Sequence, residues 1–180
     1  MITPQEVYDV MIIGAGPAGL ACAIEAQKQN LKYLVIEKGC LVNSIFRFPT
    51  NVTLFSTSDL LEIGGIPFII SASKPKRIDL LQYYRRVVAY FNLKINLYEE
   101  SILIQGQKLS FKIQTNREKN YIAEHVIVAT GQYDNPNLLN IPGENLEKVS
   151  HYYTDGSKVF IENSRNHGKK IIGHILNGNK

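Results

Sequence analysis

The chain has 180 residues, of which 44% are apolar and 20% charged. This composition suits one well-buried globular domain and excludes intrinsic disorder. The formal net charge of +4 does not predict a nucleic-acid surface, because the excess lies at the C-terminal end and not in clusters along the body. The cations of that end are Lys158, Arg165, Lys169, Lys170 and Lys180, against the single carboxylate of Glu162.

The two cysteines, Cys22 and Cys40, have neither the spacing of a redox pair nor that of metal ligands, so we predict no disulfide scaffold and no metal site. The N-terminus lacks the basic start of a secretory signal. No apolar run approaches the roughly 20 residues that span a bilayer. We therefore expect a cytoplasmic protein with no membrane or nucleic-acid partner.

The first elements form a strand, a helix and a second strand. Val7–Ile13 is short, apolar and β-branched, as in a strand buried on both faces of a parallel sheet. Apolar residues then recur at helical spacing from Pro17, a residue suited to the first helical position, to about Gln29. Lys32–Ile36 again resembles a strand and stops at Glu37. The pattern predicts one βαβ unit.

The rest of the chain completes an α/β domain. Residues 38–73 have no clear period, and a loop of this length inside a domain is usually functional. Arg77–Asn92 has the spacing of a second amphipathic helix. Four further strands are predicted at Lys94–Tyr98, Ser101–Gln105, Lys108–Thr115 and Tyr121–Ala129. We expect a parallel sheet with helices on one side and a small antiparallel β-meander on the other.

The turn between the first strand and the first helix carries a dinucleotide-binding motif. Gly14-Ala15-Gly16-Pro17-Ala18-Gly19 fits the pattern G-x-G-x-x-G. Gly14 permits the tight turn, Gly16 lets a pyrophosphate approach the backbone, and Gly19 lets the helix pack closely on the strand. The phosphates would lie at the helix N-terminus, where free N–H groups and the helix dipole favour negative charge.

Glu37 ends the second strand 23 residues after Gly14, where a carboxylate accepts hydrogen bonds from the adenosine ribose hydroxyls. The alternative is a simple glycine turn followed by a solvent-facing glutamate. The same carboxylate disfavours a 2′-phosphate, so the sequence predicts FAD or NAD rather than NADP at this site. The motif does not choose between the two.

A family resemblance favours FAD. Ala129-Thr130-Gly131, followed by Pro136 and Ile141-Pro142-Gly143-Glu144, resembles a segment of flavoproteins with paired FAD and NAD(P)H domains. Six segments carry a narrower similarity: Val35–Gly39, Val42–Ile45, Phe55–Ser58, Ile66–Phe68, Ala129–Pro136 and His151–Tyr153. By these segments the chain from about residue 7 to 156 is similar to the bacillithiol-disulfide reductase family, which is thioredoxin-reductase-like.

The resemblance implies a Rossmann-like FAD/NAD(P)-binding fold and an FAD-dependent NAD(P)H oxidoreductase of the disulfide-reductase type. NAD(P)H would be the co-substrate and a thiol/disulfide or other small molecule the acceptor; a homodimer is left open. Lys38 would join Glu37 in the cofactor site. Asn43, Ser44, Ser56 and Thr57 would lie near the flavin, and Thr130 and Gly131 would contact the cofactor. Alternatively, Ser56–Ser58 forms only a polar turn that caps a helix.

The chain departs from the family at two places. The family carries a cysteine inside the glycine motif where this chain has Ala18, so we assign no catalytic residue. Cys22, one helical turn further on, is interpreted as a small packed side chain. The second departure follows residue 156, where these flavoproteins continue into a second fingerprint. We interpret residues 1–156 as the FAD-binding domain and 157–180 as a basic polar tail, a truncated or frame-shifted start of the NAD(P)H domain.

Two other functions stay open from the sequence. A flavin-dependent monooxygenase shares the glycine fingerprint and the Ala-Thr-Gly segment. A non-catalytic nucleotide-binding remnant would keep the Rossmann part alone.

Overall fold

The computed structural model describes residues 6–107, 109–146, 149 and 151. Six strands form one sheet in the order β3-β2-β1-β6-β5-β4, in which β3, β2, β1 and β6 are parallel and β6, β5 and β4 are antiparallel. The strands are β1 Val7–Ile13, β2 Tyr33–Glu37, β3 Ile95–Leu97, β4 Ser101–Gln107, β5 Ser110–Thr115 and β6 Asn120–Val128. The predicted α/β class is confirmed, with a parallel part and an antiparallel meander.

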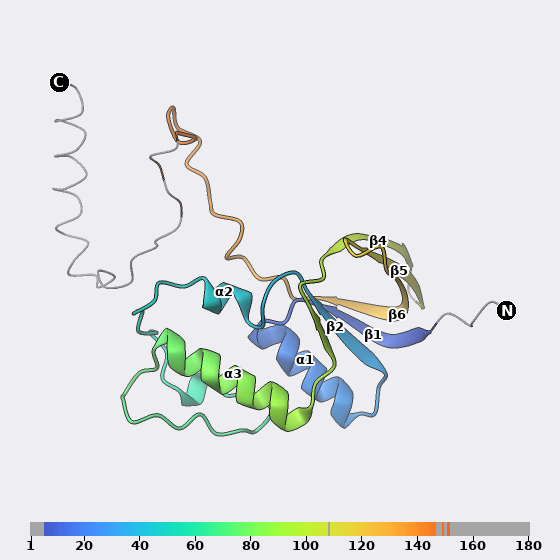
Figure 1. Cartoon of the computed structure of the whole chain (residues 1–180), viewed down its shortest axis with the longest axis horizontal. Helices are drawn as coiled ribbons and strands as arrows, with labels where there is room; N and C mark the ends of the chain where they lie inside the picture. Colours follow the sequence, from blue (N-terminus) through green and yellow to red (C-terminus); the bar gives the residue numbers. More distant parts are fainter. Residues whose placement is uncertain (1–5, 108, 147–148, 150, 152–180) are drawn as a thin grey trace.

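Helices α1 (Pro17–Lys28) and α3 (Arg77–Phe91) cover one face of the parallel strands (Figure 1). The main core lies between them and the sheet, and includes Ile12, Leu20 and Tyr84. Two short elements, α2 (Asn43–Phe46) and the 3₁₀ turn η1 (Asp59–Leu61), occupy the region without a clear period. Elements of three or four residues complete too few turns to leave a periodic signal in the sequence.

The antiparallel strands cover the opposite face of the sheet, and in Figure 1 β4 and β5 curl away from the side of α1 and α3. Ile113 of β5 and Ala123 of β6 pack there against Met11, Ile13 and Ile36 in a second, smaller core. Strand β5 also pairs with β6 in the sheet, from Phe111↔Ala123 to Gln114↔Asn120. The predicted meander is therefore both a hydrogen-bonded extension of the sheet and the cover of its second face.

The parallel register brings three chain segments to one edge of the sheet. Ile13, the last residue of β1, lies beside Ile36 of β2 and Val128 of β6. The glycine turn, Glu37 and Ala129 therefore follow strand ends at the same carboxyl edge, which is where α/β sheets bind their ligands.

No helix within the described ranges is long and apolar enough to cross a membrane. The same part of the chain holds no cluster of side chains able to bind a metal ion. The predicted domain end at residue 156 and the tail 157–180 lie outside the described residues.

Candidate dinucleotide-binding site

Two glycines of the motif are required by the fold itself. Gly14 has a φ of +110°, and a Cβ there would lie 2.4 Å from the carbonyl oxygen of Ala129. A Cβ on Gly19 would lie 1.9 Å from the carbonyl oxygen of Gly14. Any larger residue at either position must push the helix or a neighbouring strand end away. These positions set the close packing of α1 against β1 and β6.

Gly16 is different, because a Cβ built on it meets no atom within 4 Å. Its φ of −77° is open to all residue types, and no side chain or acidic residue caps the first turn of α1. The space above Gly16 is therefore free, and it lies at the uncapped N-terminus of a twelve-residue helix. An anion placed there would meet unpaired N–H groups and the positive end of the helix dipole.

Glu37 is buried beside this turn, with an exposed fraction of 7%. Its Oε2 accepts a hydrogen bond from the Ala15 N–H at 2.8 Å, and its Oε1 accepts one from the Gly39 N–H at 2.8 Å. The alternative of a solvent-facing glutamate is wrong. Each carboxylate oxygen has a second acceptor position, so the braced carboxylate can still accept a hydrogen bond from a hydroxyl group.

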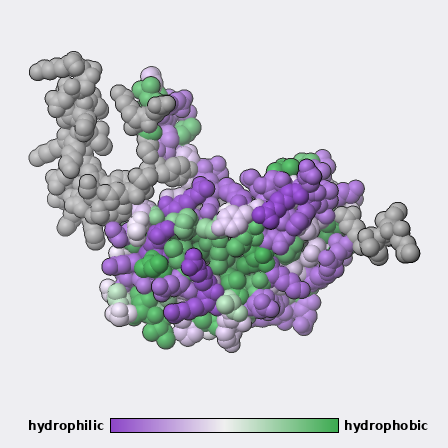
Figure 2. Space-filling view, viewed as in Figure 1, coloured by the Kyte–Doolittle hydropathy of each residue, from purple (hydrophilic) through white to green (hydrophobic). Residues whose placement is uncertain are grey.

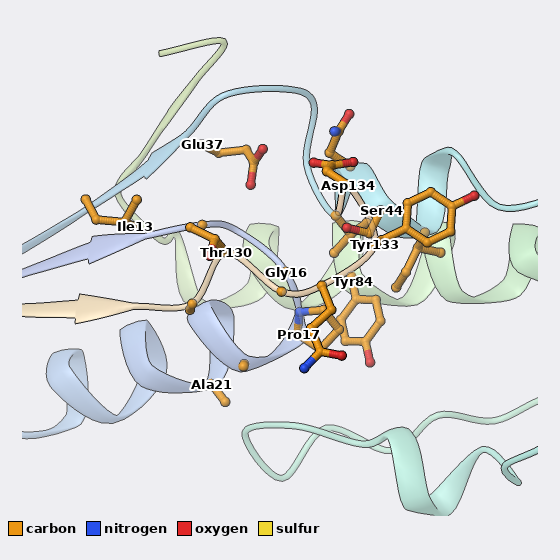
Figure 3. Close-up of a pocket in the computed structure, with 18 of the residues that line it drawn as sticks. Ile13, Gly16, Pro17, Ala21, Glu37, Ser44, Tyr84, Thr130, Tyr133 and Asp134 are labelled. Atoms are coloured by element: carbon orange, nitrogen blue, oxygen red, sulfur yellow. The ribbon is translucent and has the colours of Figure 1, made fainter. Parts of the chain in front are cut away.

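One cavity of about 710 Å³ joins the glycine turn to Glu37 and continues toward α3. Figure 3 shows Glu37 on one side of Gly16, with Ser44, Asp134 and Tyr133 on the other. In Figure 2 apolar surface occupies the middle of this face of the molecule and is bordered by hydrophilic residues. Ten predicted residues line the cavity: Gly14, Gly16, Pro17, Ala18, Glu37, Lys38, Asn43, Ser44, Thr130 and Gly131.

The other predicted residues lie elsewhere. Gly19 is buried in the packing of α1, as its predicted role requires. Ser56 and Thr57 do not line the cavity, so their place near a flavin stays a prediction. Ser58 begins η1 without a side-chain cap.

An apolar wall was missed by the sequence analysis. It comprises Phe48, Leu54, Leu61, Ile63 and Tyr84, from three separate parts of the chain. Tyr84 is almost fully buried and donates a hydrogen bond to the Leu61 carbonyl at 3.1 Å. Burial raises the pKa of Tyr84 to about 12, so the phenol keeps its proton at neutral pH. Of these residues, only Tyr84 could have been predicted to be buried, because it lies on the amphipathic helix α3.

The segment after β6 is tied to the loop after β2. The Lys38 ammonium lies 2.7 Å from Asp134 Oδ2, and the Tyr133 hydroxyl donates to the Arg47 carbonyl at 3.0 Å. The ring of Tyr133 also packs on Phe48, with centroids 5.2 Å apart. The hydrogen bond with Asp134 raises the pKa of Lys38. These contacts hold Thr130 and Gly131 against the cavity.

A polar wall follows β3 on the other side of Glu37. The Glu99 N–H donates to the Glu37 carbonyl at 2.9 Å, which places Glu99–Ser101 directly beside the end of β2. The Glu99 carboxylate accepts hydrogen bonds from Tyr121, Thr115, Lys119 and Asn96. Burial opposes its ionisation, but the hydrogen bonds of Tyr121, Lys119 and Thr115 outweigh burial and lower the pKa of Glu99.

Two buried side-chain atoms lack a hydrogen-bond partner within the part of the chain that the structure describes. They are Ser101 Oγ and Asp134 Oδ1, and both residues line this cavity. Asp134 Oδ1 lies 3.6 Å from Arg47 Nη1, too far for a hydrogen bond. A buried polar atom without a partner usually marks a group that a ligand or water satisfies. Together with the space above Gly16, these atoms fit a bound dinucleotide.

The parallel sheet, the glycine turn and the braced carboxylate define a Rossmann-type dinucleotide-binding domain. The chain belongs to the pyridine nucleotide-disulphide oxidoreductase family, whose model matches residues 11–165.

Comparisons with individual proteins agree with this assignment. Bacilliredoxin reductase Bdr of Bacillus subtilis is 45% identical over 83% of this chain and 46% of the relative. The structure of Bacillithiol Disulfide Reductase Bdr (YpdA) from Bacillus cereus matches with a TM-score of 0.80 and 45% identity, over 84% of this chain and 48% of that one.

A flavin-containing monooxygenase from Stenotrophomonas maltophilia shares the fold alone. Its TM-score is 0.66 at 21% identity, over 71% of this chain and 39% of that one. The present chain spans about half the length of the curated relatives it matches.

Proposed function

We propose that the described domain is the FAD-binding part of an NAD(P)H-dependent disulfide reductase. The observation that carries this proposal is the single cavity that joins the free space above Gly16 to the braced carboxylate of Glu37 and to Ser44 and Thr130. A dinucleotide is long enough to need all three regions. The similarity to bacillithiol disulfide reductase supports FAD as the dinucleotide.

The nucleotide half of FAD would be held by the backbone and one carboxylate. Its pyrophosphate would lie over Gly16 at the N-terminus of α1, where no side chain competes for the space. Glu37 would accept hydrogen bonds from the ribose hydroxyls at its remaining acceptor positions. Since that carboxylate repels a 2′-phosphate, NADP should bind this site poorly.

The flavin half would extend toward Ser44, Thr130 and the apolar wall. Bound FAD would supply the redox chemistry, taking hydride from NAD(P)H and passing two electrons to a disulfide. The residues of this chain would bind the cofactor, orient it and exclude water. Phe48, Leu61 and Tyr84 provide the apolar surface for this purpose.

Thiol–disulfide exchange by a cysteine of this chain is not part of the proposal. No cysteine is found among the described residues that line the cavity, and Ala18 occupies the motif position where the family has one. Cys22 packs against the main core. Burial raises the pKa of the Cys40 thiol, which disfavours the reactive thiolate. The proposal therefore assigns no electron-transfer step to Cys22 or Cys40.

Titration of the purified 180-residue protein with FAD tests the proposal, because binding quenches or polarises flavin fluorescence. We expect saturable binding that ADP reverses and NADP⁺ does not. FAD that fails to bind, or NADP⁺ that competes as well as ADP, would contradict it.

Anaerobic mixing of the FAD-loaded protein with NADPH then separates cofactor binding from turnover. We expect the oxidised flavin band to bleach slowly, at a rate that does not saturate with NADPH concentration. The 180 residues hold one dinucleotide-binding fingerprint, and hydride transfer needs both the nicotinamide and the flavin ring to be oriented.

A further inference from the structure

We propose that the buried side chain of Val42 is an anchor that positions helix α2, and with it Asn43 and Ser44, against the flavin half of the cavity. This inference rests on the proposed function. Val42 immediately precedes α2 and lines the cavity. Because its side chain has no polar atom, Val42 acts on the cofactor through the residues that follow it.

The backbone of Val42 adopts a conformation that valine rarely takes. Its φ is +49° and its ψ is +48°, in the left-handed region. A β-branched side chain is disfavoured there, whereas glycine adopts this conformation without strain. Seven non-glycine residues in the described part of the chain have a positive φ; six are exposed, and Val42 is the one that is buried and β-branched. Since glycine would suit the backbone better, we infer that this position requires the valine side chain.

The side chain of Val42 belongs to the main core, in the same cluster as Ile45 and Tyr84, with an exposed fraction of 1%. Its backbone connects two parts of the cavity. The Val42 N–H donates to the Ala15 carbonyl at 3.2 Å, and the Phe46 N–H donates to the Val42 carbonyl at 3.0 Å. Val42 therefore joins the glycine turn to the first turn of α2, and the burial of its side chain fixes this junction.

Asn43 and Ser44, the first two residues of α2, depend on this junction for their orientation. Both line the cavity. Helix α2 has four residues and no side-chain cap, so its orientation must come from tertiary contacts at its two ends. At the C-terminal end the Arg77 guanidinium donates to the Phe46 carbonyl at 3.0 Å. At the N-terminal end the buried side chain of Val42 provides the corresponding contact.

Val42→Gly tests the anchor, because glycine can adopt the same backbone conformation and the variant loses only the side chain. Asn92→Gly is the matched control: Asn92 is exposed after α3, outside the cavity, with a φ of +49° and a ψ of +50°. The affinities of ADP and FAD are measured by calorimetry. We expect Val42→Gly to weaken FAD about tenfold and ADP less than about twofold, since ADP does not reach α2. Asn92→Gly should change neither affinity.

Val42→Ala is a second variant, which keeps the Cβ and shortens the anchor, and it decides the question if Val42→Gly does not fold. We expect it to weaken FAD about threefold with little change in ADP. A merely structural role would weaken ADP and FAD by the same factor. A ratio of FAD to ADP affinity equal to that of the parent, in either folded variant, would overturn the role of Val42 alone. A parent protein that binds neither ADP nor FAD would instead overturn the proposed function.

Discussion

The two ends of the cavity differ in how the chain builds them. The proposed nucleotide end comes from β1, α1 and β2, consecutive elements between Val7 and Glu37, and it presents backbone groups and one braced carboxylate. The opposite end takes its surface from α2, η1, α3 and the segment after β6. In the proposed function a local motif would hold the pyrophosphate and the ribose, whereas the flavin part would require distant segments to meet. ADP and FAD therefore act as probes of one end and of both ends.

The largest expected effect is at Gly16. Replacing Gly16 with Val should fill the pyrophosphate space and weaken both ADP and FAD at least about 100-fold, equivalent to ~2.7 kcal/mol. The ligand-free protein should melt near the parent temperature, because the backbone allows a side chain and nothing lies within 4 Å. Gly19→Ala is the matched contrast and should unfold far more easily, since its Cβ would overlap the Gly14 carbonyl. Normal FAD binding by Gly16→Val would refute the role of this loop.

Glu37→Ala should also weaken both ligands, by about 1–3 kcal/mol each, because buried hydroxyls lose a charged acceptor. It should lower the free energy of unfolding as well, since the N–H groups of Ala15 and Gly39 lose their partner. Calorimetry and urea unfolding measure the two effects separately. A loss of stability with unchanged affinity would show that the carboxylate only braces the turn.

Ser44→Ala should distinguish the two ends of the cavity by their ligand affinities. We expect FAD affinity to fall about three- to tenfold, for one lost hydrogen bond at the flavin end, while ADP affinity stays the same. Ser58→Ala, outside the cavity, is the control. If ADP weakened as much as FAD, Ser44 would act on the whole site and the division into two ends would be wrong.

The smallest expected effect concerns the wall beside the nucleotide end. Glu99 is fully buried, and its folded pKa lies below the ordinary value of 4.5. Its ionisation therefore stabilises the fold above pH 4.5, and this contribution is lost as the pH falls through the lowered pKa. Between about pH 5 and 3, Glu99→Gln should show a flatter dependence of unfolding free energy on pH than the parent. Identical slopes in urea titrations would contradict the assigned pKa direction.

The sequence by itself determined the nucleotide end. Strand β1 has the predicted bounds, α1 begins at the predicted Pro17, and the glycine turn and Glu37 meet as their spacing requires. Each of these features depends on residues close together in the chain: a φ that favours glycine, a proline at the helix start, and a carboxylate at the end of the neighbouring strand. Local backbone sterics and helix polarity were enough to predict them.

Only the tertiary structure decided the rest of the site. Leu61 and Tyr84 form one apolar wall, and Lys38 pairs with Asp134, although no sequence pattern connects either pair. Whether the Ser101 hydroxyl has a hydrogen-bond partner depends on how the meander folds over the sheet and on which neighbouring groups already bond to the Glu99 carboxylate. Burial and hydrogen-bond satisfaction are properties of packed surfaces from distant segments, so they become defined only when the sheet assembles.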